Sequence, residues 1–116
     1  MAKTSGYELI IVVVNSGYSS LVMEAANSIC PTGGTVMHAQ GTANKDAEEF
    51  FHISIQHEKD VVLMVVPTSS KDDILHAIYK HAGLSSDGQG IAFSLTVNDV
   101  AGLKPLMIKT DTKDNK

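Results

Sequence analysis

Two short runs of apolar, mostly β-branched residues constrain the fold of this chain more than any other feature. The first extends from Leu9 to Val14 and the second from Val61 to Val66. Continuous runs of this length are typical of strands that are covered on both faces or lie close to an interface. We therefore expect both segments to be buried strands of one sheet.

The remaining segments alternate between helical and strand periods. Apolar residues fall on one helical stripe from Ser19 to Cys30. A second helix is predicted to begin at Ser70, whose hydroxyl would cap the first turn beside Asp73, and to end at Gly83. Further strands are predicted at residues 35–40, 51–56 and 91–97, with a polar bend at residues 57–59.

When the segments 51–56 and 61–66 on either side of the polar bend are counted as one strand, the order βαββαβ predicts an α+β fold of the ferredoxin-like type, an antiparallel sheet with two helices on one face. The other sheet face is then left open, and the residues expected there are largely apolar. An apolar open face favours self-association around a closed symmetry axis. We expect a single domain over residues 1–109 and a flexible polar tail over residues 110–116.

Composition excludes several classes of protein. The nine Lys and Arg residues are outnumbered by thirteen Asp and Glu residues, which weighs against nucleic-acid binding. Cys30 is the single cysteine and cannot form an internal disulfide. Without a signal-peptide pattern or an apolar run of about 20 residues, we expect a cytoplasmic protein.

Catalytic motifs are absent from the sequence. It contains no nucleophile elbow, Walker-type loop, H-E-x-x-H pair or Cys/His signature. The adjacent pairs Asp72-Asp73 and Glu48-Glu49 are unsuited to acid/base chemistry, because neighbouring side chains point apart on a helix or strand. We therefore expect a protein that is not an enzyme.

Five histidines raise the possibility of a metal site. His76 and His81 point about 140° apart on the second helix and cannot share an ion within one subunit. His38 and His52 could be cross-strand partners, with His57 nearby, and symmetry-related copies could complete a site at a trimer axis. The alternative is that these three histidines line a wet interface and change charge near neutral pH.

A set of short glycine and strand landmarks recurs in a fixed order. It consists of Gly33-Gly34-Thr35-Val36, Gly41, Val65-Val66-Pro67, and Gly88-Gln89-Gly90 followed by Ile91-Ala92-Phe93. In order and spacing the set resembles the PII family of nitrogen-regulatory signal-transduction proteins. The chain is accordingly identified as a divergent PII-like protein.

The resemblance covers about residues 8–103 and implies a homotrimer of ferredoxin-like subunits. It implies a small-molecule effector, such as ATP, ADP or AMP, in each cleft between neighbouring subunits. It also implies that the T-loop, between the second and third strands, controls a target protein, for which a membrane transporter or a metabolic enzyme is a reasonable expectation. The cofactor-binding residues predicted by position are Thr35, Gly41, Lys45, Gly88, Gln89 and Gly90. The alternative function is a metal-binding or metal-responsive trimer on the same fold.

Departures from the family pattern concern the charges around the ligand. Gly88 and Gly90 would let backbone amides approach an anion, or they serve only as a turn between helix and strand. Ile91 replaces the family's basic residue, so the charged clamp on a triphosphate is absent. Ala43 and Lys45 replace a glycine and a metal-chelating glutamine; Lys45 either supplies positive charge or is a solvated lysine.

The predicted T-loop is shorter than in the family and contains no tyrosine. Phe50-Phe51-His52 occupies the stretch where many members carry a modifiable tyrosine, so uridylylation is not expected. Any signal would come from ligand-induced ordering of the loop. The two phenylalanines either form a docking patch or pack, Phe51 in the core and Phe50 on a neighbouring subunit.

Overall fold

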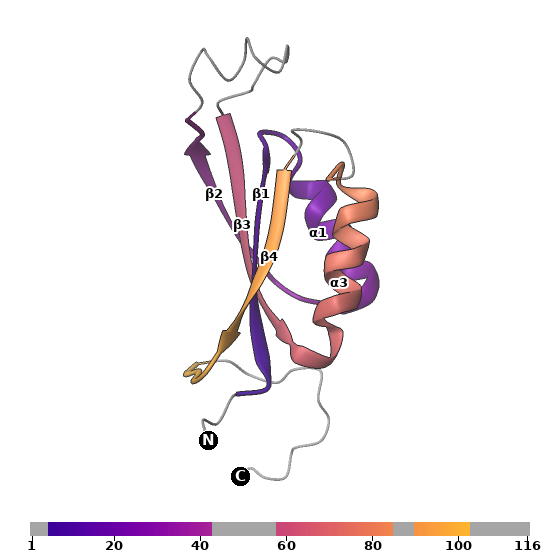
Figure 1. The fold of residues 1–116 in the computed structure, drawn as a ribbon, viewed down its shortest axis with the longest axis vertical. Helices are drawn as coiled ribbons and strands as arrows, with labels where there is room; N and C mark the ends of the chain where they lie inside the picture. The colour runs from indigo at the N-terminus through magenta and orange to yellow at the C-terminus, as the bar shows by residue number, and fades with distance from the viewer. Residues whose placement is uncertain (1–4, 43–57, 85–89, 103–116) are drawn as a thin grey trace.

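The structure of the protein is a computed structural model in which residues 5–42, 58–84 and 90–102 are described. In this part of the chain, four strands form one antiparallel sheet and two helices lie together on one of its faces (Figure 1). The elements are β1 (Tyr7–Asn15), α1 (Ser19–Ile29), β2 (Thr35–Gln40), β3 (Glu58–Pro67), α3 (Thr68–His81) and β4 (Gly90–Val97).

The strand order β2-β3-β1-β4 places the two apolar runs of the sequence in the centre of the sheet. In the register, Val12 of β1 lies opposite Val62 of β3 on one side and opposite Ala92 of β4 on the other. All three pairs of neighbouring strands are antiparallel. The predicted α+β, ferredoxin-like arrangement is therefore confirmed.

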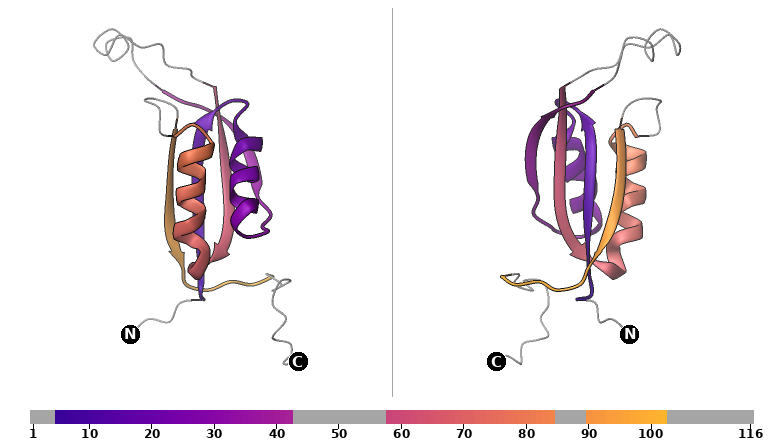
Figure 2. Two further views of the ribbon diagram at one scale, coloured as in Figure 1. Left: turned by 90° about the vertical axis from the view of Figure 1, so that its right-hand side faces the viewer. Right: turned by 60° about the vertical axis from the view of Figure 1, so that its left-hand side comes forward.

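The core lies between the sheet and the two helices, which cover the same face in both views of Figure 2. Successive side chains of a strand point to opposite faces, so every second residue of β1 and β3 enters this layer. The buried aliphatic strand residues are Ile10, Val12, Val14, Val62, Met64 and Val66. They pack with Val22, Ala25 and Ala26 of α1 and with Ile74, Ala77 and Ile78 of α3.

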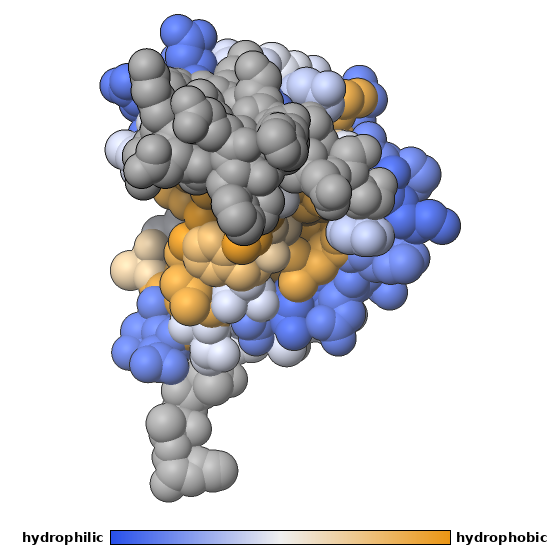
Figure 3. Space-filling model, turned by 45° about the horizontal axis from the view of Figure 1, so that its top comes forward, coloured by the Kyte–Doolittle hydropathy of each residue, from blue (hydrophilic) through white to orange (hydrophobic). Residues whose placement is uncertain are grey.

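The opposite sheet face is apolar and no helix of the described residues covers it. Figure 3 shows hydrophobic side chains gathered in one area with hydrophilic residues beside it. Strand alternation and register assign to this open face Leu9, Ile11, Val13, Met37, Val61, Leu63, Val65, Ile91, Phe93 and Leu95. Five of these side chains, those of Met37, Val65, Ile91, Phe93 and Leu95, are exposed. The predicted apolar open face is confirmed.

Helix α3 begins at Thr68, two residues before the predicted start at Ser70. Pro67 precedes the helix in an extended conformation, and no side chain caps the first turn. Instead, the Thr68 N–H donates to the carbonyl oxygen of Gly6 at 2.9 Å. The prediction was wrong because a backbone group distant in the sequence satisfies this amide.

The prediction of a polar bend at residues 57–59 was also wrong for Glu58 and Lys59, because both residues belong to β3. Glu58 pairs with Gln40 on one side, and Lys59 pairs with Asn15 on the other. Cross-strand pairing therefore overrides the polar character of this segment.

Two predicted features lie outside the described residues: the strand at 51–56 and the tail at 110–116. The boundaries of β2 agree with the prediction, and α1 ends one residue before Cys30. Neither α1 nor α3 is long and apolar enough to cross a membrane.

Candidate functional site

One end of the sheet gathers the termini of all four strands. There β2 ends just before Gly41, β3 begins at Glu58, β1 ends at Asn15 and β4 begins at Gly90. The antiparallel register aligns these termini, because Gln40 lies opposite Glu58 and β1 pairs with both β3 and β4. Two of the predicted site residues, Gly41 and Gly90, are thus brought to the same end of the sheet.

These two glycines lie at the ends of opposite edge strands. A row across the sheet runs from His38 through Asp60 and Val14 to Gly90. Strands are spaced by about 4.8 Å, so the two ends of this row are roughly 14 Å apart. Within one subunit, a single phosphate group cannot contact both edges.

The structure places Thr35 away from this sheet end. Thr35 opens β2, is exposed and pairs with Leu63, whose side chain is on the open face. It lies three residues along the strand from His38, or roughly 10 Å. Its predicted role in ligand binding stays a prediction. Lys45, Gly88 and Gln89 lie outside the described residues, and their predicted roles stay predictions as well.

Gly90 has a packing role of its own. A Cβ atom at this position would lie 2.5 Å from the carbonyl oxygen of Val13 and 2.8 Å from Cδ2 of Leu84. A side chain there would therefore collide with the backbone of β1. This close approach favours Gly90 as a structural glycine that lets β4 pair with β1. Its predicted role in ligand binding stays a prediction.

The neighbouring Ile91 belongs to the apolar open face. It pairs with Val13, and its side chain is 58% exposed. This uncharged side chain extends the apolar surface to the start of β4.

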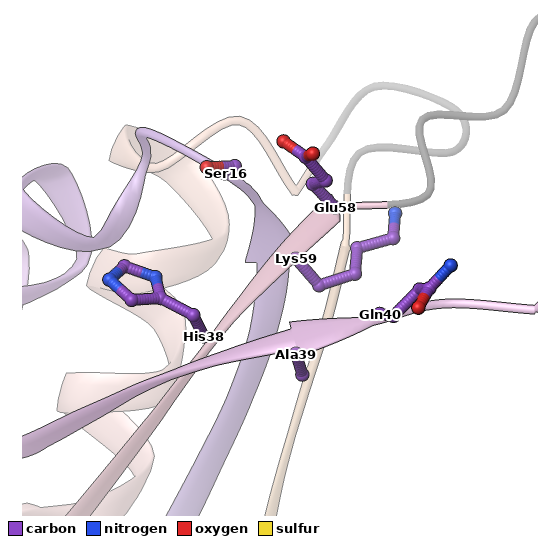
Figure 4. A pocket seen from close by; sticks show the side chains of 6 residues that line it. All are labelled: Ser16, His38, Ala39, Gln40, Glu58 and Lys59. Carbon is purple, nitrogen blue, oxygen red and sulfur yellow. The ribbon is translucent and has the colours of Figure 1, made fainter.

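A polar pocket of about 700 Å³ lies at the same end of the sheet as Gly41. Figure 4 shows its lining residues, Ser16, His38, Ala39, Gln40, Glu58 and Lys59. The Lys59 Nζ donates to Oδ1 of Asn15 at 2.7 Å. The pocket walls therefore offer side chains of both charges together with hydroxyl, amide and imidazole groups.

A buried carboxylate anchors one side of this region. Asp60 is only 2% exposed, and its Oδ2 accepts a hydrogen bond from the Gly17 N–H at 3.1 Å. Its Oδ1 lies 2.9 Å from Nδ1 of His38. The Gly17 amide and then the His38 hydrogen bond lower the pKa of Asp60, while burial acts in the opposite direction. Asp60 is therefore held in its charged form.

On β3, the residue opposite His38 is Asp60. The prediction that His38 and His52 could be cross-strand partners stays a prediction. His52 and His57 lie outside the described residues. Within residues 5–42, 58–84 and 90–102, no three His, Cys, Asp or Glu side chains form a group that could hold a metal ion. Sequence analysis did not identify Asp60, although an acidic residue directly before the run at Val61 was a usable signal.

Solved structures with the same arrangement of elements exist. The structure aligns with PII from Arabidopsis thaliana bound to citrate with a TM-score of 0.63 and 22% sequence identity, over 83% of this chain and 79% of that chain. It aligns with CPII, a nitrogen regulatory PII-like protein from Thiomonas intermedia K12 bound to ADP, AMP and bicarbonate, with a TM-score of 0.62. This chain has the PII-like fold.

The second of these alignments covers 84% of this chain and 96% of CPII at 8% identity. A functionally unknown protein from Pediococcus pentosaceus ATCC 25745 has a TM-score of 0.59 at 12% identity, over 84% of this chain and 98% of that chain. No family model and no curated protein matches the sequence. The PII-like fold is therefore preserved here although little of the sequence is shared.

Proposed function

We propose that this chain is a homotrimeric regulatory protein, not an enzyme, which binds a small anionic effector in clefts between its subunits. The observation that carries the proposal is the apolar open face of a sheet with the PII-like fold. A sheet face with five exposed large apolar side chains is typical of an interface.

A closed trimer would cover the open face and would also build the clefts. Three copies around one axis turn their open faces toward one another, which removes Phe93, Leu95 and their neighbours from water. The edge strand β2 of one copy then approaches the edge strand β4 of the next. Gly41 and Gly90, which lie at opposite edges of one sheet, would meet across such a cleft.

The effector we propose is an adenine nucleotide. CPII from Thiomonas intermedia was solved with ADP, AMP and bicarbonate, and Arabidopsis PII with citrate, so both relatives in fold hold anions. Because Ile91 brings no positive charge to the start of β4, we expect ADP or AMP to bind more tightly than ATP.

The output of the regulator would be a contact with a target protein. The chain between Gly41 and Glu58 connects β2 to β3 at the same end of the sheet as the polar pocket. Ligand binding in the adjacent cleft would therefore change the surface of this connection that contacts the target protein. We expect the target to be a membrane transporter or a metabolic enzyme, contacted from the cytoplasm.

A thermal-shift panel tests the proposal. A ligand that binds only the native state stabilises it, by about 2.7 kcal/mol at 100 times its Kd. We expect ADP or AMP to raise the melting temperature in a saturable way. ATP, citrate, bicarbonate and the ions Zn²⁺, Cu²⁺ and Ni²⁺ complete the panel. A response to metal ions alone would favour the alternative of a metal-responsive trimer, and no response to any anion would contradict the proposal.

A further inference from the structure

The sheet ends in two edge strands whose outer sides have no partner strand among the described residues. β2 forms one edge and β4 forms the other (Figure 2). Three antiparallel pairings separate them, so β2 and β4 run in opposite directions. When copies of the chain are arranged around an axis parallel to the strands, β2 of one copy can therefore meet β4 of the next as an antiparallel neighbour.

An apolar pocket of about 270 Å³ lies at the β4 edge. Its lining residues come from α3, from the turn after this helix and from the start of β4, and they are Leu75, Tyr79, Leu84, Gly90, Ile91 and Ala92. None of these six residues carries a charge. The side chains of Tyr79 and Ile91 are 52% and 58% exposed, so the pocket leaves large apolar groups in contact with water.

The size and chemistry of this pocket favour a protein side chain as its occupant. Pockets for small molecules usually have volumes of about 300–1,000 Å³ and contain several polar groups that orient the ligand. Here the Tyr79 hydroxyl is the only polar side-chain group of the six lining residues. Ile91 also belongs to the open face, so the pocket continues the surface that would be covered in the proposed trimer. We therefore look for the occupant on a second copy of the chain.

Val36 is the residue of β2 that matches the pocket. A row across the sheet runs from Val36 through Val62 and Val12 to Ala92. Residues paired in this way point to the same face, so Val36 and Ala92 both lie on the helix side of the sheet. Val36 is the one apolar residue that β2 presents on this face, and it is 42% exposed. The two features thus lie at the same level on opposite edges.

We propose that Val36 of one copy inserts into the β4-edge pocket of the next copy, against Leu75, Tyr79 and Ala92. The inference rests on the proposed trimer and adds to it a contact on the helix side of the sheet. Gly41 lies five residues beyond Val36 along the chain, so this contact leaves the end of the cleft near Gly41 and Gly90 free for an effector.

Cysteine cross-linking tests the contact. In a Cys30→Ser background, the double variant Val36→Cys/Tyr79→Cys is treated with a short bismaleimide and run on a denaturing gel. Within one chain the two positions belong to opposite sides of the sheet, whose edge strands are roughly 14 Å apart, so a short link can form only between copies. We expect bands of two and three linked chains.

The control is Val36→Cys/Lys80→Cys. Lys80 is exposed and follows Tyr79 on α3, but it does not line the pocket, and consecutive helical residues point about 100° apart. We expect this control to lose the linked bands. Sedimentation of the same samples separates the contact from the trimer itself.

A trimer in which Val36→Cys/Tyr79→Cys links no better than the control would overturn the contact and leave the proposed trimer intact. A monomeric wild-type protein would overturn both.

Sedimentation equilibrium of Val36→Ala gives a second test. The substitution removes two carbon atoms from each contact and should weaken each contact about tenfold, so the dissociation constant of the trimer should rise roughly a thousandfold. Leu21→Ala is the matched control, because Leu21 is an apolar residue of similar exposure on α1. Equal dissociation constants for the two variants would overturn the proposal.

Discussion

The Oδ2 atom of Asp60 accepts a hydrogen bond from the backbone N–H of Gly17 at 3.1 Å, which fastens β3 to the turn before α1. Gly17 has a φ of 99°, a conformation that glycine adopts at little cost. Its amide points at a carboxylate that is almost fully buried. Among the residues that the structure describes, Asp60 is the one buried charged side chain, and this hydrogen bond gives it a partner.

Replacing the buried Asp60 by Ala should lower the melting temperature by roughly 5–10 °C, since the amide of Gly17 and the Nδ1–H of His38 would lose their acceptor. Asp72→Ala is the matched control, because Asp72 is exposed and bonds only to Lys71 at the surface among the described residues. Thermal unfolding followed by circular dichroism distinguishes the two variants. Equal melting temperatures for them would contradict the anchoring role of Asp60.

Acid should weaken the fold through the same carboxylate. The native pKa of Asp60 is held below its ordinary value, about 3.9, by the Gly17 amide and then by His38. The contribution of ionised Asp60 to the free energy of unfolding is therefore present above about pH 4 and is lost as the pH falls through the lower native pKa. We expect the difference in unfolding free energy between wild type and Asp60→Asn, measured in urea, to shrink from pH 5 toward pH 2. A difference that grows as the pH falls from 5 to 2 would contradict the lowered native pKa of Asp60.

Gly90→Ala should destabilise the protein by about 1–3 kcal/mol, because the new methyl group would meet the Val13 carbonyl at 2.5 Å. Gly33→Ala is the control: nothing lies within 4 Å of a Cβ at Gly33. Denaturant unfolding measures both changes. If Gly90→Ala were as stable as Gly33→Ala, the close approach of β4 to β1 would not constrain this position.

A charged residue on the open face should break the proposed trimer. Phe93 on β4 and Leu21 on α1 are both 40% exposed, but Phe93 belongs to the open face and Leu21 lies on a helix. We expect Phe93→Lys to sediment as a monomer and Leu21→Lys to sediment like the wild type. A trimeric Phe93→Lys would mean that another surface carries the association.

The sequence predicted most elements of the fold because their patterns are local. The apolar runs at Leu9 and Val61 are β1 and β3, and the helical stripe after Ser19 is α1. Features that depend on partners far along the chain were missed. The start of α3 is set by the Gly6 carbonyl, and Glu58 is held in β3 by pairing with β2.

The site was predicted less completely for the same reason. Glycine landmarks identified Gly41 and Gly90, which the structure brings to one end of the sheet. Two of the hydrogen-bond partners of Asp60, Gly17 and His38, are 43 and 22 residues away, so its place directly before the run at Val61 was the only local sign of a buried carboxylate. His38 was noticed as a histidine, but its hydrogen bond with Asp60 was not predicted.

Isothermal titration of the assembled protein with ADP tests the central claim most directly, once sedimentation has established the oligomeric state. Clefts between three identical subunits predict saturable binding that approaches one ADP per chain, with weaker binding of ATP. An intact trimer that binds neither ADP nor AMP at millimolar concentration would contradict the account.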